Sequence, residues 1–532
     1  MGPVPSTVGS LFASRAQVLR DVPAICDGAG TKTYAALRDR VAALAGHLAT
    51  RGVRAGDRVA VLARNRSEYL EVILACAWTG AICANQNWRL ADAELTHCLD
   101  LVAPALLVAS PDEAPRLRAR REPLLVFGDD YAAALGAAAP QTGPAPIDPE
   151  SPLLILYTSG TTGLPKGAVI SHRAQILRNL VVRAELGIAP RDAYVAWSPL
   201  YHMGGCEYAL GALMSGGTVH VVDGFDGERI ADLVERERIG WLLLMPGMVG
   251  RFADLLEARG TVPRGVTICG VMADLVPRAD LARITTLLRA PYVNTFGATE
   301  TGNPPASASL IPIGVAPTTL AKEQSAFCEV RLVDEDGRDV ADGQPGELWM
   351  RGPTLFSGYW GVDASQTFRD GYFPMGDVFV RNPDGTLDFV DRRKYLIKSG
   401  GENIYPAEIE RVLLADARVA EAAVVRRPDA RWGEIPVAFV ARTDASLTAD
   451  ALLAACKDQL AGYKKPREIV FIAYEAFPRS ASGKVLRHEL ERLLPPASAS
   501  REEWGTERSE NRGSTHDEAA ERAARAGASK QQ

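Results

Sequence analysis

The chain has 532 residues, which is too long for a single hydrophobic core, so we expect at least two domains. Its hydrophobic fraction of 47% and charged fraction of 23% are typical of globular proteins, and its net charge of −6 argues against a nucleic-acid partner. The cysteines form no C-x-x-C pair, which argues against a zinc site and a disulfide framework and favours a cytoplasmic protein.

The N-terminal residues show no basic stretch followed by an apolar one, so we expect no secretion signal. The least charged run, residues 72–88, contains Thr79, Gly80 and Asn85. This run predicts a core helix and a turn, and we expect no transmembrane segment.

The first third of the chain alternates between helix and strand patterns. Apolar residues at helical spacing from Tyr34 to Leu48 predict a helix that Gly52 ends, Arg58 to Ala63 predicts a buried strand, and Ser67 predicts the N-cap of another helix. Such alternation predicts βαβ units on a mainly parallel sheet. Residues 110–150, rich in Ala, Pro and Arg, predict a loosely structured connection.

A loop rich in glycine and hydroxyl side chains lies between the apolar runs 153–157 and 168–170. Converging backbone N–H groups, hydroxyl donors and one lysine would together bind phosphate. The spacing differs from that of a Walker loop, and a surface turn without a ligand is the plain alternative. The predicted phosphate ligands are Thr158, Ser159, Gly160, Thr161, Thr162, Gly163 and Lys166.

The stretch from Tyr157 to Gly167 resembles the signature of the adenylate-forming enzymes, which include acyl- and aryl-CoA ligases, peptide-synthetase adenylation domains and luciferases. The resemblance covers residues 10–495 and continues in motifs at 294–300, 372–377 and 478–485. It implies ATP and Mg²⁺ as cofactors and coenzyme A as a co-substrate.

The resemblance places the acid substrate beside residues 197–205, where His202 begins a helical run. A lone histidine is usually structural, but the resemblance implies that His202 is a catalytic residue. Family members that activate amino acids carry an Asp near this point, and this chain lacks it, so we expect an acid without an α-amino group. Glu207 either selects a polar group of the acid or lies outside the pocket. The small residues at the predicted pocket suggest a medium-length or cyclic apolar acid, or serve only backbone turns; they are Gly204, Gly205, Gly297, Ala298 and Gly302.

Two further motifs of the large domain imply nucleotide contacts. Gly270 lies in a turn that resembles the family's adenine platform, and residues 301–327 are expected to border the acyl pocket. In the 294–300 motif, an aromatic ring suits stacking on adenine, a hydroxyl suits phosphate, and a carboxylate suits Mg²⁺. The implied site residues there are Asn294, Thr295, Phe296, Thr299 and Glu300, with Glu300 as the metal ligand.

The last motifs imply a small domain that moves. Asp377 matches the residue that binds the ribose hydroxyls, Arg392 is expected to reach the nucleotide, and Lys394 lies at the hinge position. Lys484 matches the catalytic lysine, and the turn at Gly400, Gly401 and Glu402 is expected to border a pantetheine tunnel. We therefore expect an N-terminal domain at 1–392, a C-terminal domain at 393–495 and a disordered tail at 496–532.

The predicted fold class is α/β, with a large N-terminal domain of mixed sheets flanked by helices and a small mobile α+β C-terminal domain. The implied activity is that of an ATP-dependent acid–CoA ligase, which forms an acyl-AMP with release of pyrophosphate and then an acyl-CoA. Loading of a separate carrier protein is the alternative; a light-emitting enzyme and a silent nucleotide-binding sensor are the others. A homodimer is compatible with the sequence.

Overall fold

The computed structural model describes residues 6–158, 164–274, 276–399, 402–479 and 485–494. Contacts divide the chain into two compact units, the first comprising Met1–Met375 and Phe379–Phe389, the second Gly376–Val378 and Val390–Gln532. The predicted domain boundary after residue 392 differs from this division by a few residues and stays a prediction. The predicted tail from residue 496 lies outside the described residues.

The first unit contains a long mixed sheet whose interior strands run parallel and whose two edge strands run antiparallel to their neighbours. Its strands, in spatial order, are β16 (Leu310–Ile311), β13 (Tyr292–Val293), β12 (Gly265–Cys269), β11 (Arg238–Leu242), β9 (Ala193–Ala196), β10 (Val219–Val221), β1 (Pro23–Asp27) and β2 (Gly30–Thr33).

A second sheet of the first unit is parallel except for the pair that carries the predicted phosphate loop. Its strands, in spatial order, are β6 (Leu124–Val126), β5 (Leu106–Ala109), β3 (Arg58–Leu62), β4 (Ile82–Gln86), β7 (Pro152–Thr158) and β8 (Lys166–Ser171). The parallel strands are connected through helices, as βαβ units require.

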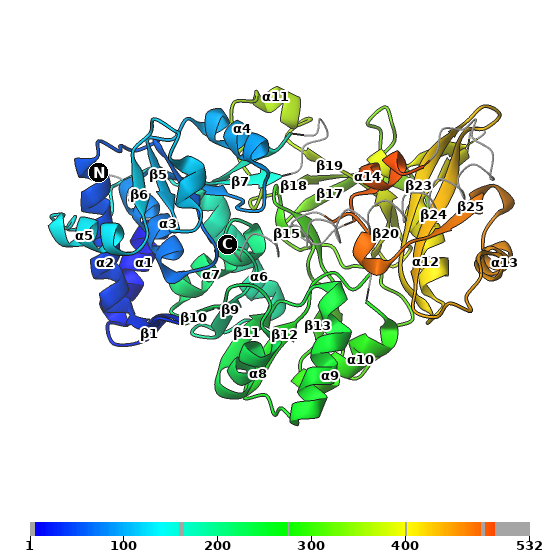
Figure 1. Ribbon diagram of the computed structural model, residues 1–532, viewed down its shortest axis with the longest axis horizontal. Coiled ribbons are helices and arrows are strands. Elements are labelled where there is room, and N and C mark those ends of the chain that lie inside the picture. The colour runs from blue at the N-terminus through cyan, green and yellow to red at the C-terminus, as the bar shows by residue number, and fades with distance from the viewer. Residues whose placement is uncertain (1–5, 159–163, 275, 400–401, 480–484, 495–532) are drawn as a thin grey trace, which may run out of the picture. The chain divides into compact units, whose positions relative to one another are not determined.

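The main core of the first unit joins helices to strands of both sheets. The helices of this core are α1 (Val8–Val18), α2 (Tyr34–Thr50), α3 (Ser67–Thr79), α5 (Asp129–Ala137), α6 (His172–Leu186) and α7 (Met203–Ser215). On the other face of the long sheet pack α8 (Gly227–Arg236), α9 (Val249–Arg259) and α10 (Arg278–Leu288), visible below the strands in Figure 1. Against the second sheet pack α4 (Asp92–Val102) and the short helix η1 (Ala114–Leu117).

Smaller elements complete the first unit. The hairpin of β14 (Phe296–Ala298) and β15 (Gly302–Ala306) carries the 294–300 motif. A further sheet has the order β17 (Glu329–Val333), β18 (Pro345–Arg351), β19 (Phe373–Arg381) and β20 (Leu387–Arg392), and the division between the units falls inside its last two strands. The short helices are η2 (Pro246–Met248) and α11 (Ala364–Thr367).

The second unit is a sheet with helices on both faces. The sheet joins β22 (Glu402–Ile404), β21 (Ile397–Ser399), β24 (Gly433–Arg442), β23 (Val419–Asp429) and β25 (Glu468–Phe471). One face packs against α12 (Pro406–Leu414) and α13 (Ala449–Gln459), and the other packs against α14 (Arg487–Arg492). Its short helices are η3 (Arg393–Tyr395), η4 (Gly462–Lys464) and η5 (Tyr474–Ala476).

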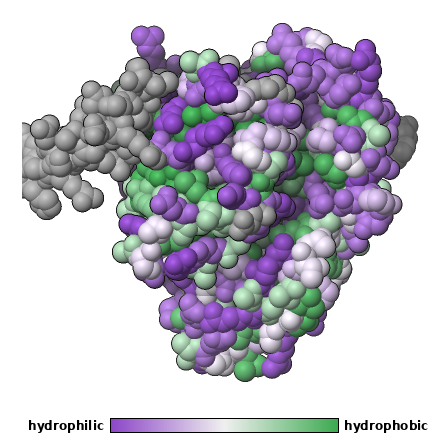
Figure 2. Space-filling model, turned by 90° about the vertical axis from the view of Figure 1, so that its right-hand side faces the viewer, coloured by the Kyte–Doolittle hydropathy of each residue, from purple (hydrophilic) through white to green (hydrophobic). Residues whose placement is uncertain are grey.

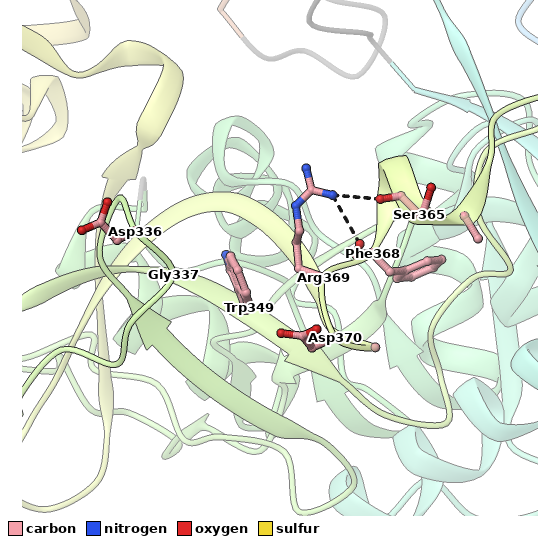
Figure 3. A pocket seen from close by; sticks show the side chains of 9 residues that line it. Asp336, Gly337, Trp349, Ser365, Phe368, Arg369 and Asp370 are labelled. Carbon is pink, nitrogen blue, oxygen red and sulfur yellow. Dashed lines mark hydrogen bonds between the residues drawn. The ribbon is translucent and has the colours of Figure 1, made fainter.

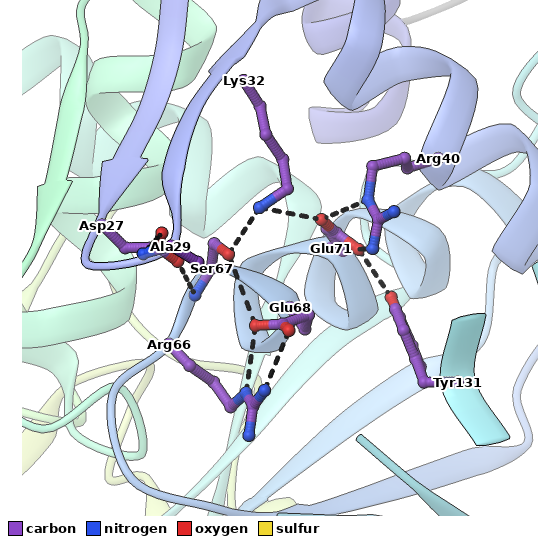
Figure 4. Close-up of polar contacts among 9 residues, drawn as sticks. All are labelled: Asp27, Ala29, Lys32, Arg40, Arg66, Ser67, Glu68, Glu71 and Tyr131. Atoms are coloured by element: carbon purple, nitrogen blue, oxygen red, sulfur yellow. Dashed lines mark hydrogen bonds and ion pairs between the residues drawn. The ribbon is translucent and has the colours of Figure 1, made fainter. Parts of the chain in front are cut away.

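A buried carboxylate in the first unit shows how this core accommodates charge. Glu71 of α3 is fully buried, and Arg40 donates to both of its oxygens, at 2.7 and 2.9 Å. The Tyr131 hydroxyl donates to it at 2.8 Å, and Lys32 Nζ lies 3.7 Å away (Figure 4). This carboxylate is satisfied by protein groups, so it needs no ligand.

Three local predictions need correction. Residues 110–150 are not a loose connection, since β6 adds to the second sheet and α5 packs against α2. Ser67 is the first residue of α3 and not its N-cap, a position that Arg66 holds without a side-chain bond. The sequence predicts Ser171 as the N-cap of a helix with Ile176, Leu177, Leu180 and Val181 on one apolar face. That face is partly wrong, because Leu180 is 53% exposed while Arg178 is buried.

Hydrophobic and hydrophilic residues are mixed on the surface. Exposed large hydrophobic side chains such as Leu180, Ile313 and Leu493 are far apart in the sequence, and the face in Figure 2 shows hydrophobic areas interrupted by hydrophilic residues. Isolated apolar side chains of this kind need no partner. Within the described ranges, no helix is both long and apolar enough to span a bilayer.

Candidate active site

The predicted phosphate loop closes a β-hairpin at the edge of the second sheet. Strands β7 and β8 pair antiparallel, with Thr158 opposite Lys166. The apolar residues of both strands are buried, which fixes the two ends of the loop. The predicted ligands Ser159, Gly160, Thr161, Thr162 and Gly163 lie outside the described residues.

Lys166 and Glu300 meet through a tyrosine. The Lys166 ammonium lies 5.2 Å from the centre of the Tyr359 ring, and the Tyr359 hydroxyl donates to Glu300 Oε1 at 2.8 Å. Burial, together with the neighbouring Glu300 carboxylate, raises the pKa of the Tyr359 hydroxyl, so it stays a donor. The cation of one motif and the carboxylate of another therefore belong to one connected group.

Tyr359 is held by a segment that extends the edge of β8. The backbone N–H of Trp360 donates to Gly167 O at 2.7 Å, and that of Phe356 donates to Glu300 O at 2.8 Å. The sequence motifs predict no role for Tyr359. No local pattern signals it, because its partners are distant in the chain and only the fold brings them together.

The 294–300 motif occupies a tight hairpin. A Cβ on Gly297 would lie 2.0 Å from Gly302 O, so only glycine fits there. Thr299 and Glu300 occupy the turn, where Ala298 N donates to Thr301 Oγ1 at 3.0 Å. Glu300 is 9% exposed, and its accepted bond from Tyr359 orients the carboxylate.

Beneath this turn lies a buried ion pair. Arg178 of α6 is 3% exposed, and it donates to Glu207 of α7, which is 2% exposed. The same guanidinium donates to Thr299 O at 3.0 Å and to Thr354 O at 2.9 Å. Burial raises the pKa of the Glu207 carboxyl, and the Arg178 charge opposes the rise. Glu207 is therefore engaged by protein, and the pair supports the turn at Thr299.

Asn294 is also engaged by protein groups. Its amide oxygen accepts from Ala273 N at 3.2 Å and from the buried Lys322 Nζ at 2.7 Å, and its nitrogen donates to Leu320 O at 2.8 Å. Lys322 also lies 2.8 Å from Asp274, and burial lowers the pKa of its ammonium. The described contacts leave one amide hydrogen of Asn294 for a nucleotide.

The neighbouring motif residues are held just as closely. Phe296 is 8% exposed and packs against Phe379 and Phe389, with ring centres 4.7 and 5.6 Å away, so little of its ring is open to a base. Thr295 is buried and lies 3.4 Å from Asn303 O. Their predicted nucleotide contacts stay predictions.

Gly270 and His202 mark two more segments of the site. Gly270 has φ +77°, and its carbonyl accepts from Trp241 Nε1 at 2.7 Å. His202 is the N-cap of α7, where its Nδ1 accepts from Gly204 N at 3.2 Å. His202 thus orients the start of the helix that is predicted to border the acid.

The small residues at the predicted acid pocket do not indicate its size. A Cβ on Gly205 would lie 2.3 Å from Pro199 O, and Gly302 has φ +78° with the Arg178 side chain beside it. A Cβ on Gly297 would likewise meet Gly302 O, so these glycines allow close approach of the backbone. This agrees with the alternative interpretation that they serve backbone turns. The size of the acid must be inferred from other residues.

In the second unit, two predicted nucleotide ligands meet. Arg392 Nε lies 3.1 Å from Asp377 Oδ1, and Asp377 is buried. Glu402 is exposed in β22. Lys484, Gly400 and Gly401 lie outside the described residues, so the structure does not place them.

A surface hollow of about 570 Å³ in the first unit involves none of the predicted site residues. Trp349, Asp336 and Asp370 line it, and Arg369 donates to the carbonyls of Ser365 and Phe368 (Figure 3). Its two carboxylates would repel a phosphate, which argues against nucleotide binding there.

Comparisons with known proteins agree with this geometry. The family described as AMP-binding enzyme matches residues 12–360, and the AMP-binding enzyme C-terminal domain matches residues 408–484. Feruloyl-CoA synthase of Amycolatopsis sp. is 36% identical over 498 residues, covering 91% of this chain and 98% of that protein. Indoleacetate–CoA ligase of Aromatoleum aromaticum is 36% identical over 490 residues, covering 87% and 93%.

A solved structure supports the same conclusion. O-succinylbenzoate coenzyme A synthetase from Bacillus subtilis, in complex with ATP and magnesium ion, matches with a TM-score of 0.79 at 26% identity, covering 91% of this chain and 99% of that one. The predicted fold class and the prediction of an AMP-forming acid–CoA ligase are confirmed, and loading of a carrier protein is not favoured. The chain belongs to the family of AMP-binding enzymes.

Proposed function

We propose that this ligase activates an aromatic carboxylic acid lacking an α-amine with Mg-ATP and transfers the acyl group to coenzyme A. The observation that carries the proposal is the connected group of Lys166, Tyr359 and Glu300, which joins the cation of the predicted phosphate loop to a buried carboxylate. The relatives that act on feruloyl and indoleacetate groups support an aromatic acid. A cytoplasmic location is part of the proposal.

Glu300 fits a magnesium ion that arrives with ATP. Among the described residues, no group of three or more His, Cys, Asp or Glu side chains could hold a metal by itself. Mg²⁺ in nucleotide sites commonly takes one or two protein carboxylates and completes its shell with phosphate oxygens and water. Glu300 would supply that carboxylate, and the bound ion would neutralise part of the triphosphate charge.

The first half-reaction is governed by the repulsion between two anions. A carboxylate oxygen of the acid attacks the α-phosphorus of ATP, and the bond to the bridging oxygen breaks to release pyrophosphate. In this proposal Thr158, Lys166 and Thr299 would hold phosphate oxygens, and Lys484 would bridge the carboxylate and the α-phosphate. Asp377 accepts hydrogen bonds from the ribose hydroxyls, with Arg392 beside it.

The second half-reaction needs a different arrangement of the small domain. The coenzyme A sulfur attacks the acyl carbon as a thiolate, and AMP leaves with the electron pair of the broken bond. This step brings no second anion to the α-phosphate, so Lys484 is not needed there. In this proposal the small domain would turn near Lys394, and Gly400, Gly401 and Glu402 would then border the path of the pantetheine arm.

The reaction is tested by pyrophosphate release with Mg-ATP over aromatic, fatty, alicyclic, dicarboxylic and amino acids, each with and without coenzyme A. We expect aromatic acids to give an acyl-CoA product that mass spectrometry identifies. Pyrophosphate release without any coenzyme A product would point to a carrier-protein acceptor, and preference for another class of acid would overturn the aromatic assignment.

The site is tested by Glu300→Gln, with Tyr359→Phe as its matched control. Glu300→Gln removes the charge and keeps the shape, so we expect adenylation to fall by roughly a hundredfold and to require more Mg²⁺. Tyr359→Phe keeps the ring near Lys166 and removes only one hydrogen bond, so we expect a loss of about tenfold or less. Equal activity of Glu300→Gln and the unsubstituted enzyme would overturn the assigned role.

A further inference from the structure

Asn303 buries an amide that the protein only half satisfies. It lies in β15, is 5% exposed, and its Oδ1 accepts a hydrogen bond from the Tyr208 hydroxyl. Its Nδ2 is buried and has no hydrogen-bond partner among the residues that the structure describes. Turning the amide over would leave the oxygen without a partner instead, because Tyr208 reaches only one of the two atoms.

An unpartnered buried amide is costly, so its presence calls for an explanation. The contrast with Glu71 is informative, because that buried carboxylate receives protein donors on both of its oxygens. Three other buried amides of the described residues, Asn85, Gln86 and Gln175, lack a partner for the oxygen, whereas Asn303 lacks one for the nitrogen, which is a donor. The unpartnered Nδ2 of Asn303 is a hydrogen-bond donor that a polar group of a ligand could use.

The position of Asn303 is fixed by the catalytic motif. Its carbonyl lies where a Cβ on Gly297 would approach it to 2.7 Å, and it accepts from Thr295 Oγ1 at 3.4 Å. Glu300 and Asn303 belong to one tight hairpin, so the amide keeps a set distance from the reacting groups. Such rigidity suits recognition of a substrate group remote from the reacting carboxylate.

An aromatic cluster connects Asn303 to the other segments of the acid site. The Tyr208 ring centre lies 4.7 Å from that of Trp241 and 5.9 Å from that of Tyr194. Trp241 donates to Gly270 O, and the Tyr194 hydroxyl donates to Gly204 O. The cluster therefore joins Asn303 to Gly204, in the segment predicted to border the acid, and to Gly270, in the predicted adenine platform.

We infer that Asn303, oriented by Tyr208, is a specificity-determining residue that donates a hydrogen bond to an oxygen on the ring of the aromatic acid. The inference rests on the proposed function and narrows its substrate class to aryl acids that carry a ring hydroxyl or ether oxygen. An acid without that oxygen leaves the amide unpaired on binding, and this penalty sets the preference.

The experiment compares acids of matched size that differ by one oxygen, such as para-methoxybenzoic with para-ethylbenzoic acid and para-hydroxycinnamic with para-methylcinnamic acid. The measured quantity is the ratio of kcat/KM for pyrophosphate release within each pair. We expect the unsubstituted enzyme to favour the oxygen-bearing acid by at least about tenfold. Asn303→Leu should bring the ratio near one while it retains turnover of the acid without oxygen, which also shows that it folds.

Two further variants separate orientation from general effects. Tyr208→Phe removes the bond that orients the amide, so it should lower the ratio by a smaller factor than Asn303→Leu. Thr367→Val removes a buried hydroxyl of α11 that, like the Asn303 amide nitrogen, has no partner among the described residues, and it should leave the ratio unchanged.

A ratio near one in the unsubstituted enzyme, or a ratio that Asn303→Leu leaves unchanged, would overturn the inference while pyrophosphate release continues. Failure of every acid to release pyrophosphate would overturn the proposed function and the inference with it.

Discussion

In the first unit buried charges hold two of the predicted site residues, whereas the charged site residues of the second unit are largely exposed. Arg178 and Lys322 are 3% and 0% exposed and bond directly to Thr299 and Asn294. In the second unit, Arg392 is 39% exposed and Lys394 and Glu402 are exposed, although Asp377 is buried. The difference suits the proposed function, in which the triphosphate needs a preorganised site and the small domain changes its contacts between the half-reactions.

The largest expected effect comes from breaking the buried pair of the first unit. Arg178→Met leaves Glu207 buried without its counter-charge, so we expect the free energy of unfolding to fall by roughly 3–5 kcal/mol. Arg178→Met combined with Glu207→Leu should recover a large part of that loss. Denaturant unfolding followed by fluorescence measures both variants.

An exposed pair of the same unit is the control for that experiment. Arg351 pairs with Glu329 at the surface, so Arg351→Met should cost less than about 1 kcal/mol. If Arg178→Met cost no more than Arg351→Met, the buried pair would not support the site as argued.

The second-largest expected effect is that of Lys484→Ala, which should differ between the two half-reactions. Lys484→Ala should lower adenylation by on the order of a hundredfold or more, because it removes a charge placed between two anions. The same variant should form the thioester from supplied acyl-AMP at nearly the unsubstituted rate. Single-turnover assays of each step measure this, with Lys457→Ala, an exposed lysine of α13, as the control. Equal losses in both steps would contradict the assigned role of Lys484.

Local patterns predicted the elements whose signal lies within one segment. The apolar runs at 153–157 and 168–170 became β7 and β8, and Ser171 caps α6 by accepting from Ala174 N. In the small unit the sequence likewise predicts a helix at 406–415 and strands at 422–425 and 437–440, and α12, β23 and β24 lie at these positions.

The sequence could not predict contacts that depend on distant partners. Arg178 interrupts an apolar pattern on α6, and only its pairing with Glu207 on another helix explains its burial. Tyr359 has no local signal, because it acts through Lys166 and Glu300. Strand β6 spans three residues, too few for periodicity, and pairing with β5 defines it.

The third expected effect is a pH dependence of the free energy of unfolding of the first unit. His172 is fully buried, its Nδ1 accepts from Val8 N at 3.3 Å, and burial lowers its pKa to about 4. The unfolded state binds the proton more readily, so the free energy of unfolding should fall by about 2 kcal/mol between about pH 7 and pH 5. His172→Asn keeps an acceptor for Val8 and should remove this slope; an unchanged slope would contradict the assignment.

The smallest expected effect is a pH dependence of the stability of the second unit, which changes with pH in the opposite direction. Asp391 is 2% exposed, and burial raises its pKa to about 6, against the Arg487 charge and with help from Glu410. Its folded form binds the proton more readily than the unfolded form, so stability is present at low pH and is lost as the pH rises through the folded pKa. Between about pH 5 and pH 7 the loss should be about 1 kcal/mol.

Asp391→Asn, which keeps an acceptor for Ala407 N, should remove that loss. Hydrogen exchange resolves the two units, so acidification should weaken protection in α1 and α6 while the Asp391 contribution strengthens it in α12. If Asp391→Asn altered the pH dependence of α6 and α12 equally, the two units would unfold as one, and the contrast between a fixed site and a movable one would need a cause other than local stability.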